Sequence, residues 1–321
     1  MPSVNNNKQP QVAVLIPCYN EEISVSKVIQ DFRQALPEAT IYVFDNNSTD
    51  NTAGVARAAG ATVITALHQG KGNVVRRMFA DIEADIYIMV DGDATYDATA
   101  ASAMMRKLLD DNLDMVVGCR VDEGEAANYR PGHRWGNRML TGAVSAVFGG
   151  QFTDMLSGYR AFSRRFVKSF PALAKGFEIE TELTIHALEL RMPYGEIQTR
   201  YGARPEGSES KLSTYKDGFR ILKTIMRFYM TERPTAFFGI IAALLSIMSI
   251  ILFVPIFSMY METGLVPRLP TAILSFGLLL AAALSFSCGL ILDNVTRGRH
   301  EMKRLAYLST PRFDRQGSHD Q

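Results

Sequence analysis

Two long uncharged stretches constrain the fold of this 321-residue chain most strongly. Residues 236–257 and 271–292 each run for 22 residues without one charged side chain. A helix of about 20 apolar residues spans the hydrocarbon core of a bilayer. Two buried helices of a soluble domain are the alternative, but such helices normally carry a polar face. The sequence therefore predicts two transmembrane helices near the C-terminus.

The charges around these stretches predict their orientation. The linker between them, residues 258–270, holds only Glu262 and Arg268 as charged residues, whereas lysines and arginines crowd both outer flanks. Basic residues stay on the cytoplasmic side of a membrane, and the polar start of the chain lacks the apolar core of a signal peptide. We therefore expect an inner-membrane protein with both termini and the large N-terminal part in the cytoplasm. The basic flanking residues are Lys216, Arg220, Lys223, Arg227 and Arg233 before the first stretch, and Arg297, Arg299, Lys303 and Arg304 after the second.

Residues 212–231 alternate apolar and basic side chains at helical spacing, which predicts an amphipathic helix on the inner leaflet. The expected organisation is a cytoplasmic domain over residues 1–210, a juxtamembrane helix over 211–234, a transmembrane hairpin over 235–293 and a basic tail over 294–321. Association through the spans into a homo-oligomer is compatible with this layout.

Composition narrows the partners of the cytoplasmic domain. The chain is 47% hydrophobic with a formal charge of +1, so it has no overall bias toward nucleic acid, and none is expected as a partner. The three cysteines lie far apart, without the spacing of a metal knuckle or a disulfide framework. A reducing compartment fits this pattern.

Short apolar runs alternate with helical patterns from residue 12 to residue 118. The regular succession of strand and helix predicts an α/β fold with a mostly parallel sheet and right-handed crossovers. Ligands bind such sheets beyond the carboxyl ends of the strands. The apolar runs are residues 12–16, 41–44, 61–65, 86–90 and 114–118, and the helical patterns are 25–36, 52–59, 73–83 and 99–111.

Polar, turn-forming sequence follows four of these runs at the same edge of the predicted sheet: PCYNEE, DNNSTD, ALHQGKGN and DGD. Any one of them is compatible with ordinary turn chemistry, but four in register favour a binding site. The two acids of DGD, Asp91 and Asp93, repel each other unless a positive charge lies between them. A hard divalent cation, Mg²⁺ or Mn²⁺, would supply it and leave coordination positions open for a diphosphate.

Seven motifs in order along roughly the first 215 residues resemble family 2 glycosyltransferases of the GT-A fold. The branch they resemble transfers sugars from nucleotide sugars to polyprenyl phosphates, as dolichol-phosphate mannose synthase does. D-x-D or GKG alone would be a weak signal. The motifs are IPCYNEE at 16–22, DNNSTD at 45–50, GKG at 70–72, DGD at 91–93, GCR at 118–120, TDMLSGYRAF at 153–162 and RPEGSESKL at 204–212.

The resemblance implies a role for each group of motif residues. The nucleotide, UDP or GDP, would be held by a donor set, with Asn47 and Ser48 supporting their loop and Thr95 standing where the family often has Gln. Asp91 and Asp93 would bind the metal and act in catalysis, and Asp154 would either position the donor sugar or orient an arginine. Glu180 is a weak candidate for a sugar contact, because acids at a helix start have a structural explanation. The donor set is Pro17, Tyr19, Glu21, Asp45, Asn47, Ser48 and Lys71.

The acceptor is expected to be a lipid monophosphate, undecaprenyl or dolichyl phosphate. Arginine binds two phosphate oxygens with its planar fork. The leading contacts are Arg120, which follows a predicted strand at the same sheet edge, and Arg138, which the resemblance implies because it lies where the family keeps an acceptor-phosphate arginine; Arg160 and Lys211 could add charge. A structural ion pair is the alternative for Arg160, and interfacial lipid binding for Lys211. A phosphomonoester is largely ionised near neutral pH and needs no strong base, which agrees with five histidines that form no cluster.

Two other functions compete with this interpretation. DGDAT also fits the D-x-D-x-T motif of haloacid-dehalogenase-type phosphatases, with Asp91 as nucleophile, although PCYNEE and DNNSTD are then unexplained. A membrane scaffold without catalysis is the other alternative. The family's processive synthases carry a Q-x-x-R-W motif, but here Arg134 and Trp135 are preceded by RPGH. Together with only two predicted spans, this favours transfer of one sugar over polymer synthesis.

Overall fold

The computed structural model describes residues 9–121, 142, 149–150, 152–176, 178–205, 223, 226 and 229–313. They belong to two compact units. The first comprises the described residues up to 205 together with those from Lys303 onward, and the second comprises those from 223 to Met302. Most of the predicted amphipathic helix over 212–231 lies outside the described residues.

A seven-stranded sheet forms the centre of the first unit, in the order β3-β2-β1-β4-β6-β5-β7. The α/β class and the five predicted strands are confirmed. The sheet is mixed, however, because β6 runs antiparallel to both of its neighbours, β4 and β5. The strands are β1 (Val12–Cys18), β2 (Thr40–Asp45), β3 (Thr62–Thr65), β4 (Ile86–Met89), β5 (Met115–Val121), β6 (Arg160–Ser163) and β7 (Tyr194–Arg200).

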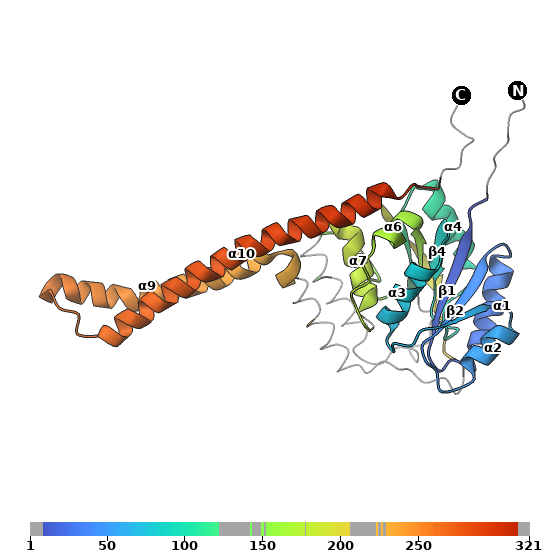
Figure 1. Cartoon of the computed structure of the whole chain (residues 1–321), viewed down its shortest axis with the longest axis horizontal. Helices are drawn as coiled ribbons and strands as arrows, with labels where there is room; N and C mark the ends of the chain where they lie inside the picture. Colours follow the sequence, from blue (N-terminus) through green and yellow to red (C-terminus); the bar gives the residue numbers. More distant parts are fainter. Residues whose placement is uncertain are drawn as a thin grey trace, which may run out of the picture. The chain divides into compact units, whose positions relative to one another are not determined.

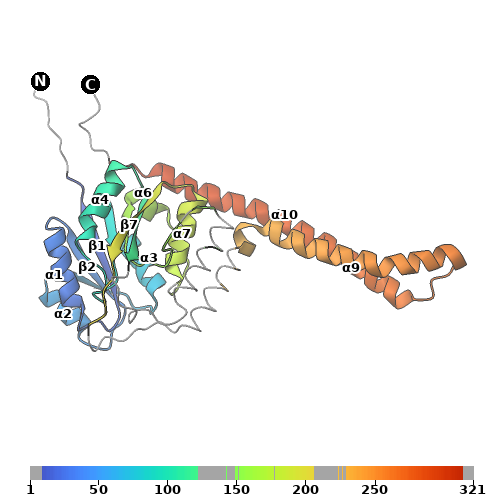
Figure 2. The same ribbon diagram turned by 180° about the vertical axis from the view of Figure 1, so that it is seen from behind.

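Helices cover both faces of this sheet (Figures 1 and 2). Helices α1, α2 and α4 lie on one face, and α3, α6 and α7 on the other. The four predicted helices agree with α1 to α4 to within two residues at each end, whereas no bounds were predicted for α6 and α7. Their bounds are α1 (Val25–Ala35), α2 (Thr52–Ala58), α3 (Lys71–Asp81), α4 (Ala100–Asp110), α6 (Arg164–Ser169) and α7 (Ile179–Glu189).

The two faces of the sheet have different cores. Alternate residues of β1 and β4, such as Val14 and Ile88, pack with the aliphatic faces of α1 and α4, as the two-residue period of a strand requires. The opposite face is aromatic, with the Phe79 and Phe162 rings 5.6 Å apart and edge to face. Burial of both faces accounts for the nearly continuous apolar runs in these strands.

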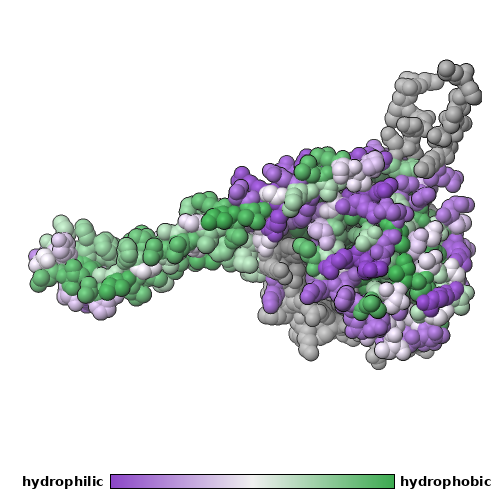
Figure 3. Space-filling model, viewed as in Figure 1, coloured by the Kyte–Doolittle hydropathy of each residue, from purple (hydrophilic) through white to green (hydrophobic). Residues whose placement is uncertain are grey.

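The second unit is a hairpin of two long apolar helices, α9 (Pro234–Thr263) and α10 (Leu269–Ser309). Both are long and apolar enough to cross a membrane, judged by length and composition alone. Their surface is hydrophobic in Figure 3, in contrast to the mixed surface over the α/β unit. The last residues of α10, from Lys303, belong to the first unit.

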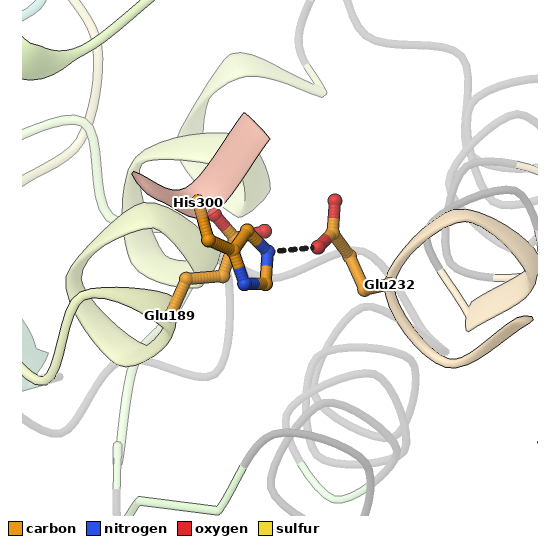
Figure 4. Close-up of side chains that lie close together, drawn as sticks. All are labelled: Glu189, Glu232 and His300. Carbon is orange, nitrogen blue, oxygen red and sulfur yellow. Dashed lines mark hydrogen bonds and ion pairs between the residues drawn. The ribbon is translucent and has the colours of Figure 1, made fainter. Parts of the chain in front are cut away.

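Buried residues at seven-residue intervals, most of them small, form the contact between α9 and α10. Seven-residue spacing is the period at which packed helices meet repeatedly, and small side chains let their backbones approach. Ser249 and Ser275 hydrogen-bond reciprocally, each hydroxyl donating to the other's carbonyl, at 2.7 and 3.0 Å. Near the end of the hairpin, His300 Nε2 lies 2.6 Å from a carboxylate oxygen of Glu232 (Figure 4). The buried positions at this spacing are Ala242, Ser249 and Ile256 on α9, and Ser275, Ala282, Gly289 and Thr296 on α10.

His186, on α7, is a neutral histidine of the aromatic core. It is 2% exposed and lies edge-on to Phe166. The Ser169 hydroxyl lies 3.1 Å from the carbonyl oxygen of Phe166 and 3.1 Å from His186 Nε2. Nδ1 has no hydrogen-bond partner among the described residues. Burial, reinforced by the positive charge of Lys303, lowers the pKa of His186 to about 3.

We predict that His186 makes stability depend on pH. Its stabilising contribution is complete above the unfolded-state pKa of about 6.5 and falls as pH drops toward 3, because only the unfolded chain binds the proton in that range. Between pH 6.5 and 4.5, His186→Gln should remove a slope approaching about 1.4 kcal/mol per pH unit. Urea unfolding of the detergent-solubilised protein, followed by circular dichroism, measures this slope. The matched control is His68→Gln, at an exposed loop position; an unchanged slope in His186→Gln would contradict the assignment.

Candidate functional site

The carboxyl ends of β1, β2 and β4 meet at one edge of the sheet. Cys18 of β1 pairs with Asp45 of β2, and Leu15 pairs with Met89, the last residue of β4. The loops that carry PCYNEE, DNNSTD and DGD are therefore neighbours. Because β6 runs in the opposite direction, the segment that enters it, with Asp154 and Gly158, reaches the same edge.

The first two loops hold each other by hydrogen bonds. The Asn20 backbone N–H donates to Ser48 Oγ at 2.9 Å, and the Thr49 N–H donates to Asn20 Oδ1 at 2.7 Å. Asn20 and Asn47 both have positive φ, a conformation that asparagine tolerates better than most residues. Pro17, at the end of β1, and Tyr19 are half-buried in the same loop region. Ser48 thus accepts a hydrogen bond that links the loop after β2 to the loop after β1.

Asp45 and Glu21 are both buried, at 6% and 8% exposure. The carboxylate of Asp45 accepts from the Ser48 N–H at 3.4 Å. The Ser24 hydroxyl donates to the carbonyl of Gly92 at 2.7 Å and lies 3.0 Å from a carboxylate oxygen of Glu21. Ser24 therefore links the segment after β1 to the DGD turn.

Asn46 connects the loop after β2 to the loop before α3, a role that sequence analysis missed. Its amide donates to the carbonyls of Ala66 and His68 at 3.1 and 2.8 Å, and its oxygen accepts from the Gly70 N–H at 2.7 Å. The motif DNN contains two asparagines, and only the backbone conformation decides which of them points inward.

The glycines of GKG allow a close approach between two segments. A Cβ on Gly70 or Gly72 would lie 2.1 or 2.3 Å from the carbonyl oxygen of Lys175 or Ala174, and Gly70 has a φ of 120°. No other residue type fits such contacts without backbone movement. This packing places Lys71, at the start of α3, inside the site.

Lys71 bridges two carboxylates. Its Nζ lies 2.5 Å from Asp91 Oδ1 and 2.5 Å from Glu180 Oε1, and its side chain is 10% exposed. Burial opposes the charge, but Asp91 and Glu180 outweigh it and raise the pKa of Lys71. Lys71 is therefore a buried, charged member of the site and not a solvated surface amine. From the sequence, Glu180 was only a weak candidate for a sugar contact. In the structure Lys71 connects it to Asp91 of the acidic turn.

Asp93 is 4% exposed and uses both carboxylate oxygens. Oδ1 accepts from Thr95 Oγ1 at 2.6 Å, and Oδ2 lies 2.7 Å from Arg204 Nη2. Burial and the charge of Asp91 raise the pKa of Asp93, while Thr95 and Arg204 oppose the shift. Asp91 and Asp93 therefore each pair with a cationic side chain from a distant segment. Their carboxylate oxygens are ligands that suit a hard divalent cation. Sequence analysis quoted the segment containing Arg204 but did not assign this residue to the site.

Arg120 and Asp154 form a bidentate ion pair at the end of β5. Arg120 Nε and Nη2 each lie 2.7 Å from one oxygen of Asp154, and the guanidinium carbon lies 5.5 Å from the ring centre of Tyr201. Of the two roles considered for Asp154, this geometry matches the orientation of an arginine. Arg138 and Lys211, the other predicted phosphate contacts, lie outside the described residues.

Arg160 is fully buried in β6, at 0% exposure. Its guanidinium donates to the carbonyls of Ser157 and Met155 and to the Thr184 hydroxyl. Burial lowers its pKa, which Glu180 and Asp154 oppose. The bond to Thr184 ties β6 to α7. Among the described residues these partners are carbonyls and a hydroxyl, and no close ion pair of Arg160 is present.

Comparisons with known proteins agree on one family. The sequence model described as "Glycosyl transferase family 2" matches residues 13–170. An uncharacterised protein of Shigella flexneri is 61% identical over 159 residues, 50% of this chain and 98% of that protein. Glycosyltransferase AglJ of Haloferax volcanii is 37% identical over 234 residues, 71% of this chain and 75% of AglJ. A dolichyl-phosphate hexose transferase of the same organism is 27% identical over 222 residues, 69% of this chain and 95% of that enzyme.

Solved structures share the fold. Glucosyl-3-phosphoglycerate synthase of Mycobacterium tuberculosis, crystallised with Mn²⁺, uridine diphosphate and glucosyl-3-phosphoglycerate, superposes with a TM-score of 0.55. The match covers 69% of this chain and 79% of that one at 21% identity. The α/β unit therefore has the fold of a GT-A glycosyltransferase.

The geometry predicts a specific clash at Gly158. A Cβ there would lie 2.4 to 3.0 Å from three carboxylate atoms of Asp91, so Gly158→Ala should destabilise the protein by about 1–3 kcal/mol. In an Asp91→Ala background the same change should cost almost nothing, because the clashing group is gone. Urea unfolding of the four proteins gives the coupling energy. Gly298→Ala, where a Cβ meets nothing within 4 Å, is the control, and an equal cost in both backgrounds would disprove the contact.

Proposed function

Because the chain belongs to glycosyltransferase family 2, we propose that it is an inverting enzyme that transfers one sugar from a nucleotide sugar to a polyprenyl phosphate. The donor is linked to UDP or GDP, and the acceptor is undecaprenyl or dolichyl phosphate. The proposed location is the cytoplasmic face of the inner membrane, with the α/β unit and both termini in the cytoplasm. One observation carries this proposal: an acidic turn and a carboxylate-held arginine share one sheet edge in a chain with two apolar helices long enough to span a bilayer.

The donor side of the site is formed by the loops after β1, β2 and β4. Asp91 and Asp93 would hold a divalent cation, Mg²⁺ or Mn²⁺, which supplies positive charge to the departing diphosphate. The Mn²⁺ and uridine diphosphate in the crystals of glucosyl-3-phosphoglycerate synthase support this choice. Asp45, Asn47 and Ser48 lie at the end of β2 and in the loop after it, at the same sheet edge, where a nucleoside would meet them.

The acceptor side needs an arginine in a fixed orientation. Asp154 holds the Arg120 guanidinium by two 2.7 Å contacts, so little side-chain freedom remains to be lost when a phosphate binds. Arg138 and Lys211 are proposed as further phosphate contacts. The name of the dolichyl-phosphate hexose transferase supports a lipid phosphate as acceptor.

The reaction would be a single displacement. An oxygen of the acceptor phosphate attacks the anomeric carbon, the bond from that carbon to the donor diphosphate breaks, and the nucleoside diphosphate leaves. The second ionisation of a phosphomonoester lies near pH 6, so the nucleophile arrives as an anion and no histidine is required. His186 is consistent with this chemistry, because it is buried in the aromatic core.

Membership of a glycosyltransferase family supports sugar transfer over the two alternatives from sequence analysis, the phosphatase assignment of DGDAT and the non-enzymatic scaffold. The Thr95 hydroxyl of the DGDAT motif donates to Asp93.

Transfer to a lipid phosphate is the direct test. Detergent-solubilised protein, incubated with a panel of UDP and GDP sugars, undecaprenyl phosphate and Mg²⁺ or Mn²⁺, should yield a polyprenyl-phosphate monosaccharide that mass spectrometry identifies. Chelation and Asp93→Asn should each reduce the yield by at least about 100-fold, because the diphosphate loses its counter-charge. Asp111→Asn, in an exposed pair with Lys107, is the matched control. Transfer that persists without metal would refute the proposed site.

The second test concerns the orientation of Arg120. Asp154→Asn should raise KM for the lipid phosphate by about 10- to 100-fold, because loss of one partner of a close charge pair costs several kcal/mol, and it should leave KM for the nucleotide sugar nearly unchanged. Steady-state kinetics with each substrate varied in turn separates the two constants. Glu83→Gln, which removes an exposed carboxylate paired with Lys168, is the control. An equal rise in both KM values would show that Asp154 acts on the donor.

A further inference from the structure

Each acid of the Asp91 and Asp93 pair already has a protein cation as partner. The Lys71 ammonium lies 2.5 Å from Asp91, and the Arg204 guanidinium lies 2.7 Å from Asp93. A divalent ion that binds these carboxylates must share them with two positive charges or displace them, since like charges at such distances repel strongly. We propose that Lys71 and Arg204 compete with the divalent cation for the carboxylates of Asp91 and Asp93. This inference rests on the proposed metal and donor site. The turn then binds metal tightly only when a nucleoside diphosphate draws these cations away.

The surroundings of Lys71 suit a cation that changes partner without leaving the site. Glu180 holds the same ammonium at 2.5 Å and is 5% exposed. Its second oxygen, Oε2, has no hydrogen-bond partner among the described residues. When Asp91 gives up Lys71, Glu180 retains it, and a buried ammonium remains in the site to pair with a diphosphate. Glu180 is thus a positioning residue for Lys71.

Arg204 is also held in place by backbone contacts. Tyr201 forms a β-bridge with Tyr96, and the Gly202 N–H donates to the carbonyl of Thr95 at 2.8 Å. These contacts bring the segment after β7 alongside the DGD turn. The Arg204 side chain is 27% exposed, in contrast to 5% for Asp93, so it can exchange Asp93 for a diphosphate at the solvent side of the turn.

Lys71 and Arg204 compete with the metal for the two acids and are attracted to the diphosphate of the nucleotide. The binding of the metal is therefore coupled to the binding of the nucleotide. Without nucleotide, both cations compete with the metal. With a nucleoside diphosphate bound, the cations gain a new anionic partner and the carboxylates become available to the metal. The metal and nucleotide should therefore each strengthen the binding of the other by the same factor.

Titration with Mn²⁺, followed by electron paramagnetic resonance of the free ion, tests this without any acceptor lipid. In the full-length protein without nucleotide, Lys71→Met and Arg204→Met should each tighten Mn²⁺ binding by about tenfold. Addition of UDP or GDP should tighten Mn²⁺ binding to the wild type, and the variants should show a correspondingly smaller effect. Arg76→Met removes a positive charge from the same helix as Lys71, where Arg76 contacts Asn73 and the carbonyl of Ala172. Its Mn²⁺ affinity should change by less than about twofold.

The outcomes separate this inference from the proposed function. If Mn²⁺ affinity in both variants is unchanged or weaker while the wild type binds Mn²⁺, the competition is disproved and the metal site stands. If the wild type binds no Mn²⁺ even with nucleotide, both proposals fail. Arg204→Met, at a partly exposed position, keeps the test valid even if loss of buried Lys71 prevents folding.

Discussion

Two carboxylates one residue apart, at the end of a buried strand, impose the constraint that the rest of this site satisfies. Asp93 is almost fully buried, and an unpaired charge in such a place is too costly to retain. The compensating cations come from separate parts of the chain: Lys71 from the start of α3 and Arg204 from beyond β7. Loops far apart in sequence are drawn to one sheet edge because each supplies a charge that the acidic turn requires.

The elements of the α/β unit were readable from sequence because their apolar patterns are local. Runs such as residues 12–16 and 86–90 are buried on both faces, and the intervening helices have the expected period. β6 and β7 were not predicted. β7 is mostly half-buried and lacks an apolar run, and β6 is four residues long and carries a charged residue, Arg160, at full burial. Only the partners of that guanidinium, which lie on other elements, make such a strand stable.

In the site too, features that depend on local sequence were predicted, and features that depend on contacts between distant residues were not. Motifs located the acids, the loop after β2 and Arg120, because residue type and position after a strand suffice for that. They did not reveal that Asn46 points inward, that Glu180 anchors Lys71 or that Arg204 meets Asp93, since each of these depends on a contact between residues separated by 20 to more than 100 positions. Likewise, hydropathy alone predicted the two apolar helices, whereas the reciprocal Ser249 and Ser275 bonds depend on the register between them.

The reversed strand also sets the distance between the two halves of the proposed reaction. β6 lies between β4, which ends at the acidic turn, and β5, which ends at Arg120. Neighbouring strands are about 4.8 Å apart, so β4 and β5 are separated by roughly 10 Å at this edge. Because β6 runs antiparallel, it fills the gap with its entering segment, where Gly158 leaves space for the Asp91 carboxylate and Asp154 orients Arg120. A parallel strand at this position would direct that segment to the opposite edge of the sheet and leave Arg120 without its partner.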